Sequence, residues 1–303
     1  MTTMSSLKSS ALALFLAAAF SLSANAQYTG PAQGQKLAFL GDSITQFGFQ
    51  QPAGYVNLVA LALKDSGHEI TVIPAGVSGN TSKDMLARLQ KDVLDKKPDW
   101  MTLSCGVNDV WHGAKGVDLE TYKQNITSIL DQCAAANIKV VILTSTMIHE
   151  DPADPLNAQL VPYNDFLRQL AKDRKLPLAD LNAAMQAELA TRKAAAAPGA
   201  RGPLLTVDGV HMNAYGNQMM ATGILQAMGL TTDQLASAKA KWDDVPGAYI
   251  VDVKVPLSIN DYTKLQTATA GENKPVDQVI SADALKDAQD LIKGNSTPSA
   301  AKP

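Results

Sequence analysis

The chain has 303 residues, of which 46% are hydrophobic and 18% are charged, and its net charge at pH 7 is −3. This length and apolar fraction fit one or two folded domains and exclude an intrinsically disordered chain. The near balance of charge argues against nucleic acid as a partner, and two cysteines are too few for a small disulfide-built fold or a zinc ribbon.

Residues 1–26 have the pattern of a secretory signal peptide. Lys8 supplies a positive charge, an apolar run follows at residues 11–20, and the sequence ANA at 24–26 matches the small-residue cleavage pattern. The alternative is a membrane anchor, for which the run is too short, since a spanning helix needs about 20 apolar residues. We therefore predict cleavage after Ala26, export to the periplasm or the exterior, and no stable membrane insertion of the mature protein.

From residue 36 onward, short apolar runs typical of buried strands alternate with stretches that have the apolar periodicity of amphipathic helices. The fourth helix has Pro162 in its first part, and this proline is an alternative start for it. Ser82 or Thr81 is expected to cap the second helix. We predict strands at residues 36–41, 69–73, 100–105, 139–144 and 176–180, and helices at 54–65, 82–95, 119–136, 157–172 and 213–228.

This alternation predicts an α/β fold with about five parallel strands, covered by helices on both faces and joined by right-handed crossovers. Ligands of such folds bind beyond the carboxyl ends of the strands. The residues that directly follow each strand are therefore the ones to search for chemistry.

Beyond the main pattern, residues 192–202 are rich in Ala, Gly and Pro and are predicted to form a flexible loop. A strand is predicted at 249–257, a helix at 282–293, and a disordered tail at the end of the chain. The predicted organisation is a signal peptide (1–26), a main domain (27–230), and an extension packed on it (231–303). Cys105 and Cys133 either pair or remain buried free thiols, and the sequence leaves both open.

Two of the motifs directly follow predicted strands. In GDSIT (41–45), Ser43 is placed at the carboxyl edge of the sheet, where it is either a nucleophile or part of a helix cap. In GVSGNT (76–81), Gly79 either presents a bare backbone N–H to a substrate or belongs to a simple glycine loop. The second motif lacks the lysine of a phosphate-binding P-loop and the second glycine of a nucleophile elbow.

Two further motifs add an amide and an acid–base pair. In GVND (106–109), Asn108 either donates to a developing oxyanion or forms an Asx-turn. In DGVH (208–211), Asp208 can accept the Nδ1–H of His211 and leave Nε2 free as a base, while a metal-ligand pair and a helix cap are the alternatives. Together the four motifs supply the parts needed for acyl transfer.

The set GDSIT, GVSGNT, GVND and DGVH resembles the four signature blocks of the SGNH hydrolases, the GDSL esterase/lipase superfamily, over about residues 36–229. Ile44 stands where the family usually has leucine. The resemblance implies a flavodoxin-like three-layer α/β/α sandwich and no metal or organic cofactor. It also implies that Ser43 is the nucleophile, His211 the base and Asp208 its orienting acid, with an oxyanion hole made by the Ser43 and Gly79 amides and Asn108.

These residues predict a serine esterase that acts on a small-molecule or polysaccharide ester, with short-chain O-acetyl groups on carbohydrate favoured by compartment and family analogy. Asp42, Trp111 and His112 are predicted to contact the substrate, and Gln46 and Tyr215 to face a sugar. The alternatives are a buried gate residue for Trp111 and a surface role for His112. The other two histidines, His68 and His149, are predicted to be solvated loop residues.

Three alternative functions remain. The first is a lipase, lysophospholipase or thioesterase that prefers longer acyl chains. The second is a metal-assisted phosphoesterase that uses Asp42, Asp208 and His211, which the lack of a companion ligand cluster disfavours. The third is a non-catalytic carbohydrate-binding protein, which has no need of the complete set of chemical groups.

Overall fold

The computed structural model describes residues 28–195, 204–246, 258–269 and 276–292. The chain divides into two compact units, residues 1–249 and 250–303. The predicted signal peptide, the predicted strand at 249–257 and the predicted tail lie outside the described residues. The division of the chain into a main domain and a packed extension therefore stays a prediction.

The first unit is built on a five-stranded parallel sheet, as the apolar runs predict. The strand order β2-β1-β3-β4-β5 is the flavodoxin-like order, in which the chain reverses direction across the sheet between β1 and β3. A crevice for ligands forms at that point because the connections leave the two strands in opposite directions. The strands are β1 (Lys36–Gly41), β2 (Thr71–Gly76), β3 (Trp100–Ser104), β4 (Lys139–Leu143) and β5 (Leu178–Ala179).

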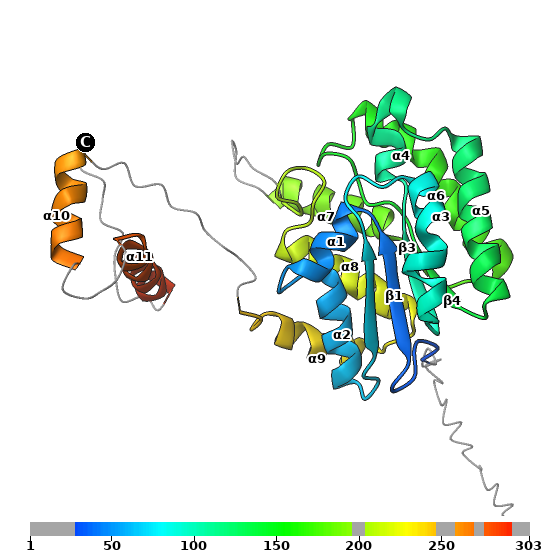
Figure 1. Ribbon diagram of the computed structural model, residues 1–303, viewed down its shortest axis with the longest axis horizontal. Coiled ribbons are helices and arrows are strands. Elements are labelled where there is room, and N and C mark those ends of the chain that lie inside the picture. Colours follow the sequence, from blue (N-terminus) through cyan, green and yellow to red (C-terminus); the bar gives the residue numbers. More distant parts are fainter. Residues whose placement is uncertain (1–27, 196–203, 247–257, 270–275, 293–303) are drawn as a thin grey trace, which may run out of the picture. The chain divides into compact units, whose positions relative to one another are not determined.

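Helices cover both faces of the sheet, which gives the three layers that the sequence predicts (Figure 1). Helices α2, α8 and α9 contact one another on one side, and α3, α5 and α6 form the layer on the other. The helices of this unit are α1 (Ser43–Gln50), α2 (Tyr55–Asp65), α3 (Ser82–Asp92), α4 (Val107–Trp111), α5 (Leu119–Ala135), α6 (Pro155–Arg174), α7 (Leu181–Ala195), α8 (Ala214–Ala227) and α9 (Thr232–Trp242).

The central strands are buried on both faces, which is why they read as continuous apolar runs rather than alternating ones. Every residue of β3 is buried, and in β1 only the first residue is exposed. Each strand therefore holds its carboxyl end rigidly, and the residues that follow it are fixed relative to one another.

The structure decides two details of the helix starts that the sequence left open. Helix α6 begins at Pro155 with Asp154 as its cap, so Pro162 lies inside the helix and does not mark its start. Pro162 is tolerated because it is exposed, while Tyr163 and Leu167 anchor the opposite face in the core. Helix α3 is capped by Thr81, not by Ser82.

Helix α7 was not predicted, and it includes residues 192–195, which we had expected to be loop. Its buried residues Leu181, Met185 and Leu189 recur every four positions, which is a helical period that the alanine-rich composition obscured. Residues 196–202 of the expected loop lie outside the described residues.

Helix α9 belongs to the first unit and covers α2. Trp242 is 1% exposed, and its indole Nε1 donates to the carbonyl of Leu58 at 3.1 Å. Lys241 forms an ion pair with Asp65 at 2.7 Å. In the second unit the structure describes α10 (Ile259–Thr269) and α11 (Val276–Ile292), so the helix predicted at 282–293 begins earlier than expected.

Both cysteines are buried free thiols, which decides between the two alternatives left open by the sequence. Cys105 donates its S–H to the Asp109 carboxylate at 3.6 Å, and burial raises the pKa of both thiols. Among the described residues, no helix is long and apolar enough to cross a membrane.

Candidate active site

The structure brings the four motifs together at the carboxyl edge of the sheet. Ser43 is the first residue of α1, directly beyond β1, and Asn108 is the second residue of α4, directly beyond β3. These two strands flank the point where the strand order reverses. Ser43 therefore sits at the positive end of a helix, where negative charge is favoured.

Ser43, His211 and Asp208 form one continuous chain of hydrogen bonds. The Nε2 atom of His211 lies 2.8 Å from Ser43 Oγ, and Nδ1 lies 2.6 Å from Asp208 Oδ2. Because an ionised carboxylate only accepts, Nδ1 carries the ring proton and Nε2 accepts the hydroxyl hydrogen of Ser43. This is the arrangement that readies a serine hydroxyl for attack.

The Asp208 carboxylate is held in its ionised form by its neighbours. Partial burial raises its pKa, but hydrogen bonds from the His211 ring and from the backbone N–H groups of His211 and Val210 outweigh this and lower the pKa. Its second oxygen accepts those two backbone hydrogens at 2.8 and 3.0 Å. The carboxylate therefore both orients the ring and fixes the loop that carries it.

Phe47, which was not predicted from the sequence, packs against the side of the His211 imidazole. Its ring lies 4.9 Å from that of His211 in an edge-to-face contact. Phe47 follows Ser43 by one helical turn, so α1 presents both residues on the same face. This spacing is the signal in the sequence that could have identified it.

The predicted oxyanion hole consists of three hydrogen-bond donors, one each from the GDSIT, GVSGNT and GVND motifs. The backbone N–H groups of Ser43 and Gly79 have no acceptor within the described part of the chain. Gly79 has a φ of +76°, which a side chain disfavours. Asn108 Nδ2 donates to the Asn80 carbonyl at 3.1 Å, and its remaining hydrogen has only a long 3.4 Å contact with Asp42.

The loop that carries Gly79 is held by two side chains that sequence reasoning did not identify in this role. Gln46, expected to face a sugar, accepts hydrogen bonds from the backbone N–H and hydroxyl of Ser78, both at 2.8 Å. Arg88 on α3 donates to the carbonyls of Gly41 and Ala75 and to the Asn80 side chain. Because it joins the ends of β1 and β2 to the loop, Arg88 fixes the spacing between Ser43 and Gly79.

Asp42 is 2% exposed and caps α1 by accepting from the backbone N–H of Ile44 at 2.9 Å. Burial raises the pKa of its carboxyl to about 6. This burial argues against the direct substrate contact that we predicted for Asp42. Its position between Ser43 and Asn108 indicates that it acts on the site through its neighbours.

Trp111 and His149 form an exposed rim beside the Asp208–His211 segment. The Trp111 side chain is 40% exposed, and its ring lies 5.1 Å from that of His149. A Cβ on Gly209 would come within 3.1 Å of the His149 ring, so the two residues are in contact. His149, predicted to be a solvated loop residue, is thus half-exposed but lies against the site.

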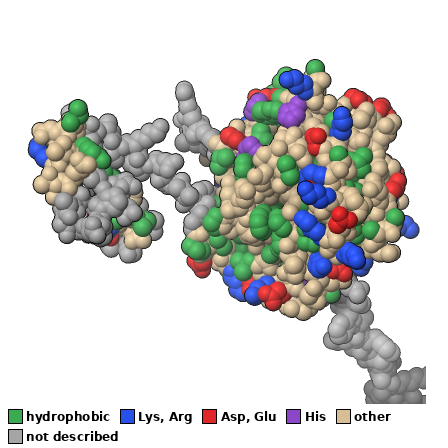
Figure 2. Space-filling model, viewed as in Figure 1, with side chains coloured by type: hydrophobic (Ala, Val, Ile, Leu, Met, Phe, Trp, Pro, Cys, Tyr) green, Lys and Arg blue, Asp and Glu red, His purple; other side chains and the backbone are tan. Residues whose placement is uncertain are grey.

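His112 is the C-cap of α4, its side chain is exposed, and its backbone N–H donates to the Asn108 carbonyl at 3.2 Å. Its predicted contact with substrate stays a prediction. Tyr215, expected to face a sugar, instead donates to Glu188 and stacks under the Arg192 guanidinium at 3.7 Å. Figure 2 shows histidine side chains gathered at the end of the unit where α4 lies.

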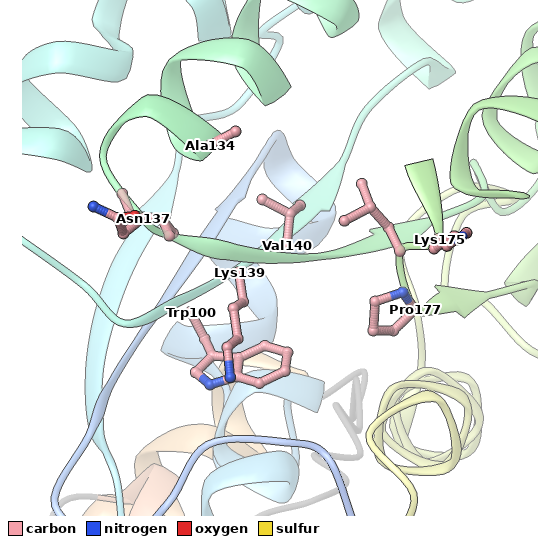
Figure 3. A pocket seen from close by; sticks show the side chains of 9 residues that line it. Trp100, Ala134, Asn137, Lys139, Val140, Lys175 and Pro177 are labelled. Atoms are coloured by element: carbon pink, nitrogen blue, oxygen red, sulfur yellow. The ribbon is translucent and has the colours of Figure 1, made fainter. Parts of the chain in front are cut away.

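A cavity of about 510 Å³ lies at the opposite edge of the sheet (Figure 3). It opens beside Trp100 and Lys139, which begin β3 and β4, and the Lys139 ammonium sits 5.0 Å above the Trp100 ring. Ser43 follows the carboxyl end of β1, so this cavity is separate from the candidate active site.

Comparison with known proteins identifies the family. Residues 39–219, which include Ser43 and His211, match the GDSL-like lipase/acylhydrolase family. The chain belongs to this family. It is a carboxylic ester hydrolase of the SGNH type, and its five-stranded parallel sheet with helices on both faces is the fold of esterases in the family.

The similar proteins include acetylxylan esterases. One from Geobacillus stearothermophilus is 30% identical over 215 residues, which are 65% of this chain and 94% of that protein. The crystal structure of the acetyl xylan esterase AlAXEase is 32% identical, has a TM-score of 0.58, and covers 63% of this chain and 98% of its own. Esterase TesA of Pseudomonas aeruginosa is 34% identical over 116 residues, 38% of this chain and 56% of that protein.

The described residues hold no group of three or more His, Cys, Asp or Glu side chains arranged to bind a metal ion. Asp42, Asp208 and His211, which the metal-assisted alternative requires, therefore do not form such a group. Asp208 and His211 are instead bonded to each other and, through His211, to Ser43.

The buried Asp42 carboxyl predicts a pH-dependent stability. Because burial raises its pKa from 3.8 to about 6, the native state favours the protonated form, and native stability falls as pH rises through this window. At about 1.36 kcal/mol per pKa unit, the loss reaches about 3 kcal/mol above pH 6. Asparagine does not titrate, so Asp42→Asn should not lose stability in this pH range. The free energy of unfolding of the variant minus that of wild type should therefore rise by about 3 kcal/mol between pH 4 and 7. Urea unfolding across this range measures it, and parallel profiles would contradict it.

Proposed function

We propose that the protein is a serine esterase that removes short acyl groups, above all O-acetyl groups on carbohydrate, through an acyl-enzyme on Ser43. The observation that carries the proposal is the unbroken hydrogen-bonded chain from Ser43 through His211 to Asp208. Such a chain lets one imidazole act first as a base and then as an acid.

In the acylation half, His211 Nε2 takes the hydroxyl proton as Ser43 Oγ attacks the ester carbonyl carbon. Asp208 stabilises the imidazolium that forms without itself taking the proton. The His211 Nε2–H then protonates the departing alcohol, and the acyl group remains on Ser43. In the second half, His211 Nε2 takes a proton from water as the water oxygen attacks the acyl carbon. The bond from that carbon to Ser43 Oγ then breaks, His211 returns the proton to Oγ, and the acid leaves.

The negative charge that develops on the carbonyl oxygen needs donors that are in place beforehand. The Ser43 and Gly79 backbone N–H groups suit this role because no group of the described chain accepts from them. The Asn108 side chain supplies the third donor, and its bond to the Asn80 carbonyl keeps the amide oriented. The N-terminus of α1 adds a favourable dipole.

Two observations support a carbohydrate substrate: the exposed rim formed by Trp111 and His149, and the names of similar proteins. The exposed Trp111 indole offers a flat apolar face of the kind that suits a sugar ring, next to a histidine that can bond a hydroxyl. The relatives named acetylxylan esterases support O-acetyl groups as substrate. The likeness to Escherichia coli thioesterase 1/protease 1/lysophospholipase L1, 28% identical over 152 residues, supports longer acyl chains as the second candidate.

We also propose that the enzyme is exported and that its signal peptide is removed after Ala26. The pattern of residues 1–26 supports this, as does a Bacillus subtilis relative named as a lipoprotein, which is 25% identical over 147 residues. Export would bring a soluble esterase to polymeric substrates that do not enter cells.

Removing the nucleophile should lower kcat more than removing one hydrogen-bond donor of the oxyanion hole. Ser43→Ala is expected to lower kcat on p-nitrophenyl acetate by at least about 10⁴-fold. Asn108→Ala removes one of three oxyanion donors and is expected to lower kcat by about 10²–10³-fold with little change in KM. Steady-state kinetics on both variants test this. A Ser43→Ala variant with substantial activity would contradict the mechanism.

The substrate proposal predicts a preference that can be measured directly. Activity on p-nitrophenyl esters should fall steeply from acetate to butyrate to octanoate. Trp111→Ala should raise KM for acetylated xylooligosaccharides by about 10-fold, which is the loss of one aromatic contact of about 1.4 kcal/mol, and leave p-nitrophenyl acetate nearly unchanged. Trp111→Phe, which keeps an aromatic face, serves as the matched control. A preference for octanoate would favour the second candidate.

A further inference from the structure

The segment that carries Asp208 and His211 does not follow a strand of the sheet. Ser43 and Asn108 are held by β1 and β3, whereas residues 204–213 precede α8 and form a small closed loop. A single antiparallel bridge joins Thr206 to Met212, and the Val207 N–H donates to the His211 carbonyl at 2.8 Å. The loop leads directly into α8, which contacts β4 and β5, and its residues Leu205 and Met212 are buried in the core.

Glu150 supplies a second attachment, which holds the end of the loop that is farther from α8. It lies in the segment between β4 and α6, seven residues beyond the end of β4. Its carboxylate accepts from the backbone N–H groups of Leu204, Leu205 and Thr206 at 2.5 to 2.7 Å. It also accepts from the Thr206 hydroxyl at 2.7 Å. Four hydrogen bonds to one carboxylate make this a strong and directional anchor.

Thr206 connects Glu150 to the segment that carries Asp208 and His211. Its hydroxyl donates to Glu150 and accepts from the backbone N–H of Gly209 at 3.0 Å, and the residue is 1% exposed. Gly209 lies between Asp208 and His211 in the DGVH motif. Two hydrogen bonds therefore connect Glu150 to the turn that sets the position of the imidazole.

We propose that Glu150 is a positioning residue for the acid–base pair, and that the Thr206 hydroxyl transmits its effect to His211. This inference rests on the proposed function, because it takes His211 as the base that activates Ser43. A displacement of reacting groups by about 1 Å can lower a rate about 10²-fold, so losing the anchor should act on turnover more than on binding.

The test uses matched substitutions in the full chain. Thr206→Val removes the hydroxyl at nearly constant size, and Thr206→Ser keeps it. Glu150→Gln keeps one oxygen as an acceptor. It replaces the other oxygen with an NH₂ group, which cannot accept from the backbone N–H groups that face it. Asp151→Asn, at an exposed position of the same segment that bonds only the Ala153 N–H through its side chain, is the control. For each variant, kcat and KM on p-nitrophenyl acetate are expressed per molecule that reacts with a fluorophosphonate.

We expect Thr206→Val and Glu150→Gln to lower kcat per reactive molecule by about 10- to 100-fold, with KM changed less than about twofold. Thr206→Ser should recover most of the activity, and Asp151→Asn should match wild type. Hydrogen exchange of the Gly209 and His211 amides should be faster in the two impaired variants. A residue with only a structural role would change the melting temperature or the reactive fraction, but not kcat per reactive molecule.

Two outcomes would overturn the inference in different ways. If His211→Ala is inactive while Thr206→Val and Glu150→Gln keep wild-type kcat per reactive molecule, the positioning role is wrong and the proposed function stands. If His211→Ala itself keeps wild-type activity, the proposed function is wrong and this inference is overturned with it.

Discussion

The hydrogen bond between His211 Nε2 and Ser43 Oγ is the interaction on which the rest of the site depends. It joins two residues that are 168 positions apart in the chain and spans 2.8 Å. One partner is fixed by a buried strand, and the other by a loop that other segments must hold. The parallel sheet places Ser43 at the edge where its strands end. The segment that carries His211 follows no strand and reaches this edge from the start of α8.

Polar groups around Ser43 hold this geometry, and the buried Asp42 does so at the expense of stability. Asp42 is enclosed between Ser43 and Asn108, where burial raises its pKa to about 6, and Arg88 binds two strand ends and the glycine loop. A core made only of apolar side chains would be easier to stabilise. It could not, however, orient N–H donors toward the carbonyl oxygen of a bound ester. Such conflicts between stability and chemistry concentrate at functional sites.

The sequence alone predicted the parallel sheet, the family and the motifs that meet at its edge, because buried strands and short motifs leave local patterns. It missed Arg88, His149 and Glu150, whose roles come from hydrogen bonds and contacts that join distant segments and have no period or spacing to read. It also missed α7, where alanine-rich composition hid the helical period. It left open whether α6 begins at Pro162, because the sequence does not show that the buried residues of this helix anchor it well enough to tolerate an exposed internal proline.

The most direct test of the central claim is to identify the residue that a fluorophosphonate modifies, by intact mass and peptide mapping of the purified protein. We expect one adduct, on Ser43, with esterase activity lost in proportion to labelling. We also expect slower labelling when His211 is replaced by alanine and no labelling when Ser43 is replaced by alanine. Modification of a different residue in step with the loss of activity would contradict it, as would full activity in a protein labelled completely on Ser43.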